Sequence, residues 1–147
     1  MKKLTLETIQ KKILTYQIIV MLSFIFGLLG FAYNTWRYEH NEQNNNIRTA
    51  SFHMIHELAS LEQNIYANHY DHNENKGNPR DAWVKVGLID DLALFISPEC
   101  KVASSALKHS WQKHWKIIQS DRNATNTLIM RIENVRKSTR SVLIKLH

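Results

Sequence analysis

The first long apolar segment of the chain covers residues 13–36, which are 24 positions without a charge. A helix rises 1.5 Å per residue, so this segment would reach roughly 36 Å, enough to cross a hydrocarbon core of about 30 Å. Twelve of its residues are Leu, Ile, Val or Phe. Together they favour membrane insertion by about 4 to 7 kcal/mol. The pattern therefore predicts a transmembrane helix.

A cleavable export signal is the alternative interpretation of the same segment. Such a signal carries an apolar core of only about 7 to 15 residues, followed by a cleavage site of the small-x-small type. Here the apolar run is longer, and the one candidate cleavage site, Gly30-Phe31-Ala32, has a bulky residue in the middle. We therefore favour a permanent signal anchor.

The flanking charges predict the orientation of this anchor. Lysine is concentrated in the basic segment 1–12, whereas Arg37 and Arg48 are the cations that follow the apolar segment closely. Cationic residues near a span tend to stay in the cytoplasm. We expect an inner-membrane protein with a cytoplasmic N-terminus and a periplasmic, or otherwise extracytoplasmic, C-terminal domain. The lysines in question are Lys2, Lys3, Lys11 and Lys12.

Aromatic residues lie at both ends of the predicted span. Tyr16 is placed at the inner edge, and Tyr33 and Trp36 at the outer edge. Amphipathic rings prefer the headgroup region, so these three residues are the candidate membrane-anchor positions. Ser23 and Gly27 form a small-xxx-small pair that would let two such helices approach closely, which leaves a homodimer as an open alternative.

The region after the span changes from polar to periodic. Residues 37–46 are polar and rich in Asn, and their pattern is compatible with a juxtamembrane linker or with a helical extension of the span. From Ile47 onward, apolar residues repeat with helical spacing, which predicts one core-facing side. This side contains Ile47, Ser51, Met54, Leu58, Leu61 and Ile65, and we expect Phe52, Ile55, Ala59 and Tyr66 to broaden it.

Two start signals divide the rest of the chain. Turn-forming residues fill positions 71–80, after which Asn78 and Pro79 have the pattern of an N-cap and a first helical position. Ser97 and Pro98 repeat that pattern and begin a third apolar period that continues to Ile118. A further break within residues 120–126 precedes a last periodic segment.

These patterns predict an all-α protein in which an N-terminal transmembrane helix is followed by a small antiparallel helical bundle over residues 47–147. Four helices joined by short breaks pack most simply as a four-helix bundle. If Pro98 only kinks one long helix, the product would instead be an extended three-helix hairpin. We expect Leu58 and Ile132 in the core, and Lys113 and Arg136 on solvent faces.

Charge is divided unevenly after the span. Residues 37–100 carry 5 Lys or Arg against 10 Asp or Glu, and residues 101–147 carry 10 against 2. The simplest interpretation is that helices of opposite charge lie beside each other. The functional interpretation is a face for an anionic partner other than nucleic acid. That face would contain Lys101, Lys108, Lys113, Lys116, Arg131, Arg136, Lys137 and Arg140.

Histidine is frequent, and four residues have spacings that place pairs of rings on one helix side. These weak candidates for a metal site are His53, His56, His69 and His72. No CxxC or HExxH pattern completes a four-ligand set, so we predict no metal or other cofactor.

Cys100 is the single cysteine, which excludes an internal disulfide. No arrangement of nucleophile, base and orienting group stands out, so we do not predict an enzyme.

Two classes of function fit these features. The favoured one is a non-enzymatic interaction or accessory subunit that docks another membrane or envelope protein. The alternative is a sensory or ligand-binding module, for a small molecule, a metal or pH, that signals through a membrane partner. In layout the chain resembles the first half of a membrane receptor with a four-helix extracytoplasmic sensor domain, as in bacterial chemoreceptors, without a ligand-binding motif that matches residue by residue.

Overall fold

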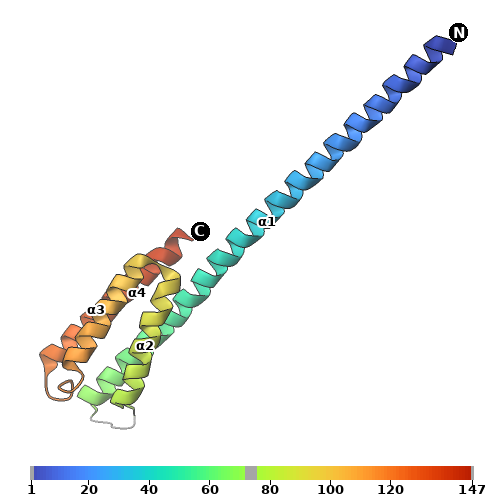
Figure 1. The fold of residues 1–147 in the computed structure, drawn as a ribbon. Helices are drawn as coiled ribbons and strands as arrows, with labels where there is room; N and C mark the ends of the chain where they lie inside the picture. Colours follow the sequence, from blue (N-terminus) through green and yellow to red (C-terminus); the bar gives the residue numbers. More distant parts are fainter. Residues whose placement is uncertain (1, 72–75, 147) are drawn as a thin grey trace. The chain divides into compact units, whose positions relative to one another are not determined.

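The computed structural model describes residues 2–71 and 76–146, and these contain four helices and no strand. Helix α1 covers Lys2–His69, α2 Pro79–Ile96, α3 Pro98–His114 and α4 Arg122–Lys145 (Figure 1). The chain divides into two units, residues 1–43 and residues 44–147, which are described separately. The all-α prediction, with one long apolar N-terminal helix and a helical bundle, is confirmed.

Residues 1–43 contain the apolar segment. Its helix is long and apolar enough to cross a membrane, and none of the apolar window is buried within the chain. The hydroxyl of Ser23 donates to the carbonyl of Ile19 at 2.9 Å, and that of Thr15 donates to the carbonyl of Lys11 at the same distance. Both polar side chains are thereby satisfied within the helix, which would be compatible with a lipid environment.

The polar stretch at residues 37–46 is helical, because α1 continues through it to His69. From residue 44 onward α1 belongs to the bundle. Its predicted core row is confirmed, with Met54, Leu58, Leu61 and Ile65 fully buried. Tertiary burial of this row, rather than helix propensity, stabilises this part of the helix.

The predicted broadening of that row is wrong for three residues. Phe52 is 60% exposed, and Ala59 and Tyr66 are also exposed, while Ile55 is half-buried. Only one side of α1 is covered by other helices of the bundle, and these three residues lie beyond it. The apolar stripe that the spacing indicated is therefore wider than the surface that the neighbours bury.

Pro98 follows a reversal of the chain and does not kink one long helix. Ser97 is extended (φ −169°, ψ 160°), closes α2 through a backbone bond to Ala93, and caps α3 by accepting from the backbone N–H of Cys100. Helix α3 packs against both α2 and α4 (Figure 1). The structure thus has the four-helix arrangement, and the three-helix hairpin is excluded.

The third helix ends earlier than its apolar period. It stops at His114, and Ile118 lies in the following turn, yet Ile118 is buried. Its carbonyl accepts from Thr125 at 3.2 Å and lies 2.6 Å from Nδ1 of His69. These two contacts fix the turn against the ends of α1 and α4, so that an apolar residue outside the helix still joins the core.

The core assignment gives the first testable prediction. Leu58 and Ile132 are fully buried, so Leu58→Asp or Ile132→Asp would place a carboxylate without a partner in the core. Such a group costs several kcal/mol, which is comparable with the whole stability of about 5 to 15 kcal/mol of a small domain. Thermal melts of the full-length chain in detergent, followed by circular dichroism, should show loss of the cooperative transition. Lys113→Glu, at an exposed position, is the control, and parent-like melts of the core variants would contradict the assignment.

Candidate functional site

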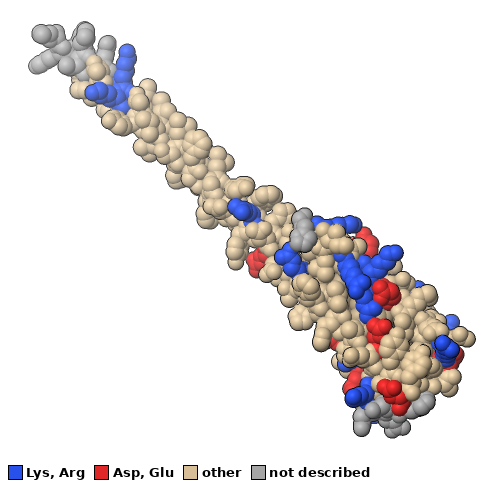
Figure 2. All heavy atoms as spheres, turned by 180° about the vertical axis from the view of Figure 1, so that it is seen from behind, with Lys and Arg blue, Asp and Glu red and all other residues tan. Residues whose placement is uncertain are grey.

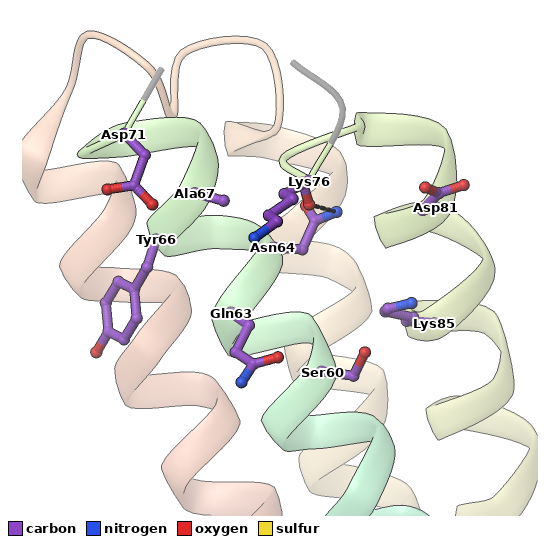
Figure 3. Close-up of a pocket in the computed structure, with 9 residues that line it drawn as sticks. All are labelled: Ser60, Gln63, Asn64, Tyr66, Ala67, Asp71, Lys76, Asp81 and Lys85. Atoms are coloured by element: carbon purple, nitrogen blue, oxygen red, sulfur yellow. Dashed lines mark hydrogen bonds between the residues drawn. The ribbon is translucent and has the colours of Figure 1, made fainter. Parts of the chain in front are cut away.

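A cavity of about 550 Å³ lies between the last turns of α1 and the first turns of α2 (Figure 3). Its volume falls within the range of roughly 300 to 1,000 Å³ that is typical of small-molecule sites. Its wall carries carboxylates, ammonium groups, amides and hydroxyls beside apolar surface. The lining residues are Ser60, Gln63, Asn64, Tyr66, Ala67, Asp71, Lys76, Asp81 and Lys85.

Two asparagines of α1 fix the chain at one side of this cavity. The buried side-chain amide of Asn64 donates to the carbonyls of Lys76 and Asn78 at 3.0 and 3.1 Å, and Asn68 donates to the carbonyl of Gly77 at 2.8 Å. A Cβ on Gly77 would lie 2.6 Å from the backbone nitrogen of Asn68, so only glycine allows this approach. The segment before α2 is therefore clamped to α1.

Tryptophan does not line the cavity, although a Trp-lined pocket would have been typical of a sensory module. The rings of Trp83 and Trp111, and of Trp83 and Trp115, pack edge to face with centroids 6.3 Å apart. Trp111 is fully buried, and the other two pack against the core. These three residues stabilise the bundle.

A second surface feature is the outer side of α2. Val84 and Phe95 are 71% and 70% exposed, and Leu88 is 42% exposed. Their spacings of four and seven place them along one line of the helix. The opposite side of α2 is the core side, formed by Ala82, Val86, Ile89, Ala93 and Ile96. Helix α2 thus has apolar residues on two opposite sides, and the periodicity of its core residues reveals only one of them.

The structure distributes the eight basic residues of the predicted anionic-partner face over several environments. Lys101 and Lys108 pair with Asp90, and Arg136 pairs with Glu62 and Glu133. Arg131 is half-buried, and the other four are exposed, namely Lys113, Lys116, Lys137 and Arg140. Cations and anions lie side by side on the bundle face shown in Figure 2. A docking role for the exposed four stays a prediction.

Arg136 corrects one expectation from the sequence. It was expected on a solvent face, but its side chain is only 15% exposed and donates to the carboxylate of Glu62 at 2.6 Å. It also donates to Glu133. The ion pair with Glu62 joins α4 to α1, so the charge of Arg136 belongs to helix packing. Its surroundings depend on a residue 74 positions away, which helical periodicity does not reveal.

Asp90 is the centre of the ionic contact between α2 and α3. Its carboxylate is buried and accepts from Lys101 at 2.5 Å, Lys108 at 2.9 Å and Ser104 at 3.1 Å. Burial would raise the pKa of the Asp90 carboxyl, but the hydrogen bonds from the two lysines and Ser104 outweigh it and lower the pKa to about 2. Asp90 is therefore charged at all physiological pH values.

The candidate metal-binding histidines are not gathered into one site. His53 and His56 are exposed on α1, whereas His69 contacts the carbonyl of Ile118. His72 lies outside the described residues. Within residues 2–71 and 76–146, no group of three or more His, Cys, Asp or Glu side chains is placed to hold a metal ion. Cys100 is buried, with its sulfur 3.7 Å from the hydroxyl of Thr139.

The candidate anchor residues form aromatic contacts along α1. The ring centroids of Tyr33 and Trp36 are 6.3 Å apart, and Trp36 lies 5.3 Å from the ring of His40. Tyr16, at the other end of the apolar segment, is exposed.

Comparisons of the chain with protein families, with curated proteins and with solved structures found no match.

The ionic contact at Asp90 predicts a specific pH dependence of stability. Its pKa is 3.8 when unperturbed and about 2 in the fold, so its contribution is fully present above pH 4 and is lost as the pH falls towards 2. The shift corresponds to about 2 kcal/mol. Urea unfolding of the parent and of Asp90→Asn should show a difference of this size at pH 6 that shrinks towards pH 2. Asp91→Asn, at an exposed neighbour, should change stability by less than about 0.5 kcal/mol; a pH-independent effect of Asp90→Asn would contradict the assignment.

Proposed function

We propose that the chain is a single-pass, membrane-anchored helical bundle that acts as a non-enzymatic interaction or accessory subunit at the outer face of the inner membrane. The observation that carries this proposal is the apolar outer side of α2, formed by Val84, Leu88 and Phe95. A surface helix normally has one apolar side, and a helix that is apolar all round is normally covered all round. A partner protein would provide the missing cover.

Gly87 supports a helix as the element that covers this side. A glycine inside a helix costs roughly 0.5 to 1 kcal/mol relative to alanine. Apart from the backbone of α2 itself, no atom of the described residues lies within 4 Å of a Cβ added at Gly87, so packing within the described bundle does not require glycine there. A glycine next to the line of Val84 and Leu88 would let a partner helix approach the backbone closely.

The charges around this line indicate a protein partner. Arg80 and Asp91 border or interrupt the apolar residues, so the surface presents both signs. A surface of anionic lipid would repel the carboxylate of Asp91. A helix of another membrane or envelope protein, with its own apolar stripe and charges of both signs, would satisfy both charges.

The proposed location rests on the span and its flanking charges. Residues 13–36 belong to a helix long and apolar enough to cross a membrane. The lysines concentrated in residues 1–12 favour a cytoplasmic N-terminus, and the tyrosines and tryptophan at the edges of the span favour the two headgroup regions. The bundle would then lie outside the cytoplasm, where α2 meets its partner.

The anchor is tested by fractionation and topology. The full chain should stay in the membrane pellet after washing with high salt or alkaline carbonate. An alkaline phosphatase fused after His147 should be active, because the lysines of residues 1–12 hold the other end in the cytoplasm. Release of a soluble chain beginning near Tyr33 would refute the proposed anchor. An inactive phosphatase fusion, together with activity of a cytoplasmic reporter fused at the same position, would refute the proposed orientation.

The docking face is tested by site-specific crosslinking. A photoreactive amino acid at Leu88 or Phe95 should give a discrete crosslinked product in membranes, and Leu88→Lys should abolish the product formed from position 95. The matched control is Met130, an exposed apolar residue of α4, where neither the photoreactive residue nor Met130→Lys should affect the product. Since these positions are exposed, the variants should melt within about 0.5 kcal/mol of the parent. Equal crosslinking from positions 88, 95 and 130 would count against a docking face on α2.

A further inference from the structure

We propose that the cavity between α1 and α2 binds a small zwitterionic molecule, with one ammonium group and one carboxylate, of the size of a free amino acid or a dipeptide. This ligand site is distinct from the docking line of α2, and neither depends on the other. The cavity of about 550 Å³ is large enough for such a molecule.

The chemistry of the wall favours a ligand with polar groups. Four of the described lining residues carry a carboxylate or an ammonium group, and Ser60 and Gln63 add a hydroxyl and an amide. An apolar molecule would remove water from these groups without replacing their hydrogen bonds, which is unfavourable. The ligand should therefore carry polar groups that replace this water.

The balance of charge narrows the ligand class further. Asp71 and Asp81 contribute two negative charges and Lys76 and Lys85 two positive charges, so the lining residues that the structure describes carry both signs in equal number. A purely anionic ligand would face the two carboxylates, and a purely cationic ligand would face the two lysines. A molecule that carries both signs can meet Asp81 and Lys85 each with its opposite.

The arrangement of side chains assigns the two ends of the ligand. Ser60 and Gln63 on α1 and Lys85 on α2 line the cavity (Figure 3), and they supply a hydroxyl, an amide and an ammonium donor. Charge-assisted donors of this kind suit a carboxylate. The ammonium group of the same ligand would then bind Asp81 or Asp71.

Two of the charged groups are uncommitted within the described part of the bundle. Asp81 and Lys85 are one turn apart on α2, a spacing that allows an ion pair. Nevertheless, the ion pairs among the described residues use Asp90, Glu62 and Glu133 as acids. Asp81 and Lys85 therefore retain their full capacity to bind a ligand.

The cavity wall is also held in place before a ligand arrives. Asn64 and Asn68 bind three consecutive carbonyls, of Lys76, Gly77 and Asn78, and so fix the start of α2 against α1. A preformed wall reduces the loss of conformational entropy on binding. This favours measurable affinity for a ligand with few atoms.

The full-length chain in lipid nanodiscs provides the test. Isothermal titration with each of the twenty common amino acids, and with diglycine, should identify at least one compound that binds saturably. The N-acetyl form of that compound, which lacks the ammonium group, and its amide form, which lacks the carboxylate, should each bind roughly tenfold more weakly or worse. Absence of binding by all of these zwitterions, or equal binding of the acetylated form, would overturn the proposal.

Variants connect the binding to this cavity. Lys85→Met and Asp81→Asn should each weaken binding of the identified compound by roughly tenfold or more, and Gln63→Ala should weaken it less. Lys113→Met and Asp91→Asn, at exposed positions away from the lining, are the controls and should bind like the parent. Circular dichroism should show the same helicity for all five variants. Unchanged affinity in both Lys85→Met and Asp81→Asn would place the ligand elsewhere and overturn the assignment.

Discussion

The fold of residues 44–147 depends on one constraint, which is that the apolar row of α1 must be removed from water. Met54, Leu58, Leu61 and Ile65 occupy a single side of one helix, and a helix cannot bury its own side chains. The cover comes from elements distant in sequence, as the contacts of Asn64 with the segment before α2 and of Glu62 with α4 demonstrate. The antiparallel bundle is the simplest arrangement of three further helices that provides it.

Burial of apolar area does not by itself decide how the helices align, because such contacts lack direction. The polar contacts add that information. Asp90 accepts from two lysines and a serine of α3 and thereby fixes the register of α2 against α3, while Glu62 and Arg136 fix α1 against α4. Sliding either pair by one turn would leave a buried or half-buried charge without its partner, which is far more costly than a shift of apolar contacts.

Local chemistry made the element boundaries predictable from the sequence, and tertiary context made other features unpredictable. Caps and prolines at Asn78, Ser97 and Pro98 act within a few residues, so the starts of α2 and α3 followed from their patterns. The exposure of Phe52 and the ion pair of Arg136 depend on which neighbouring helix covers which part of a helix. Periodicity along one helix carries no information about its neighbours. The cavity is harder still, because its wall combines the end of α1 with the start of α2, and their juxtaposition depends on the clamp at Gly77.

Helix α2 concentrates three different surfaces on 18 residues. Its core side is required for folding, its side towards α1 carries Asp81 and Lys85, and its outer line carries Val84, Leu88 and Phe95. Stability accounts for the first surface, but it gives no reason to keep large apolar residues in water or to leave neighbouring opposite charges unpaired. A helix selected for stability alone would carry polar residues on its outer line, since these would cost nothing in packing. The side chains of α2 that the bundle does not use are therefore the observations on which the proposed docking face and the proposed ligand site rest.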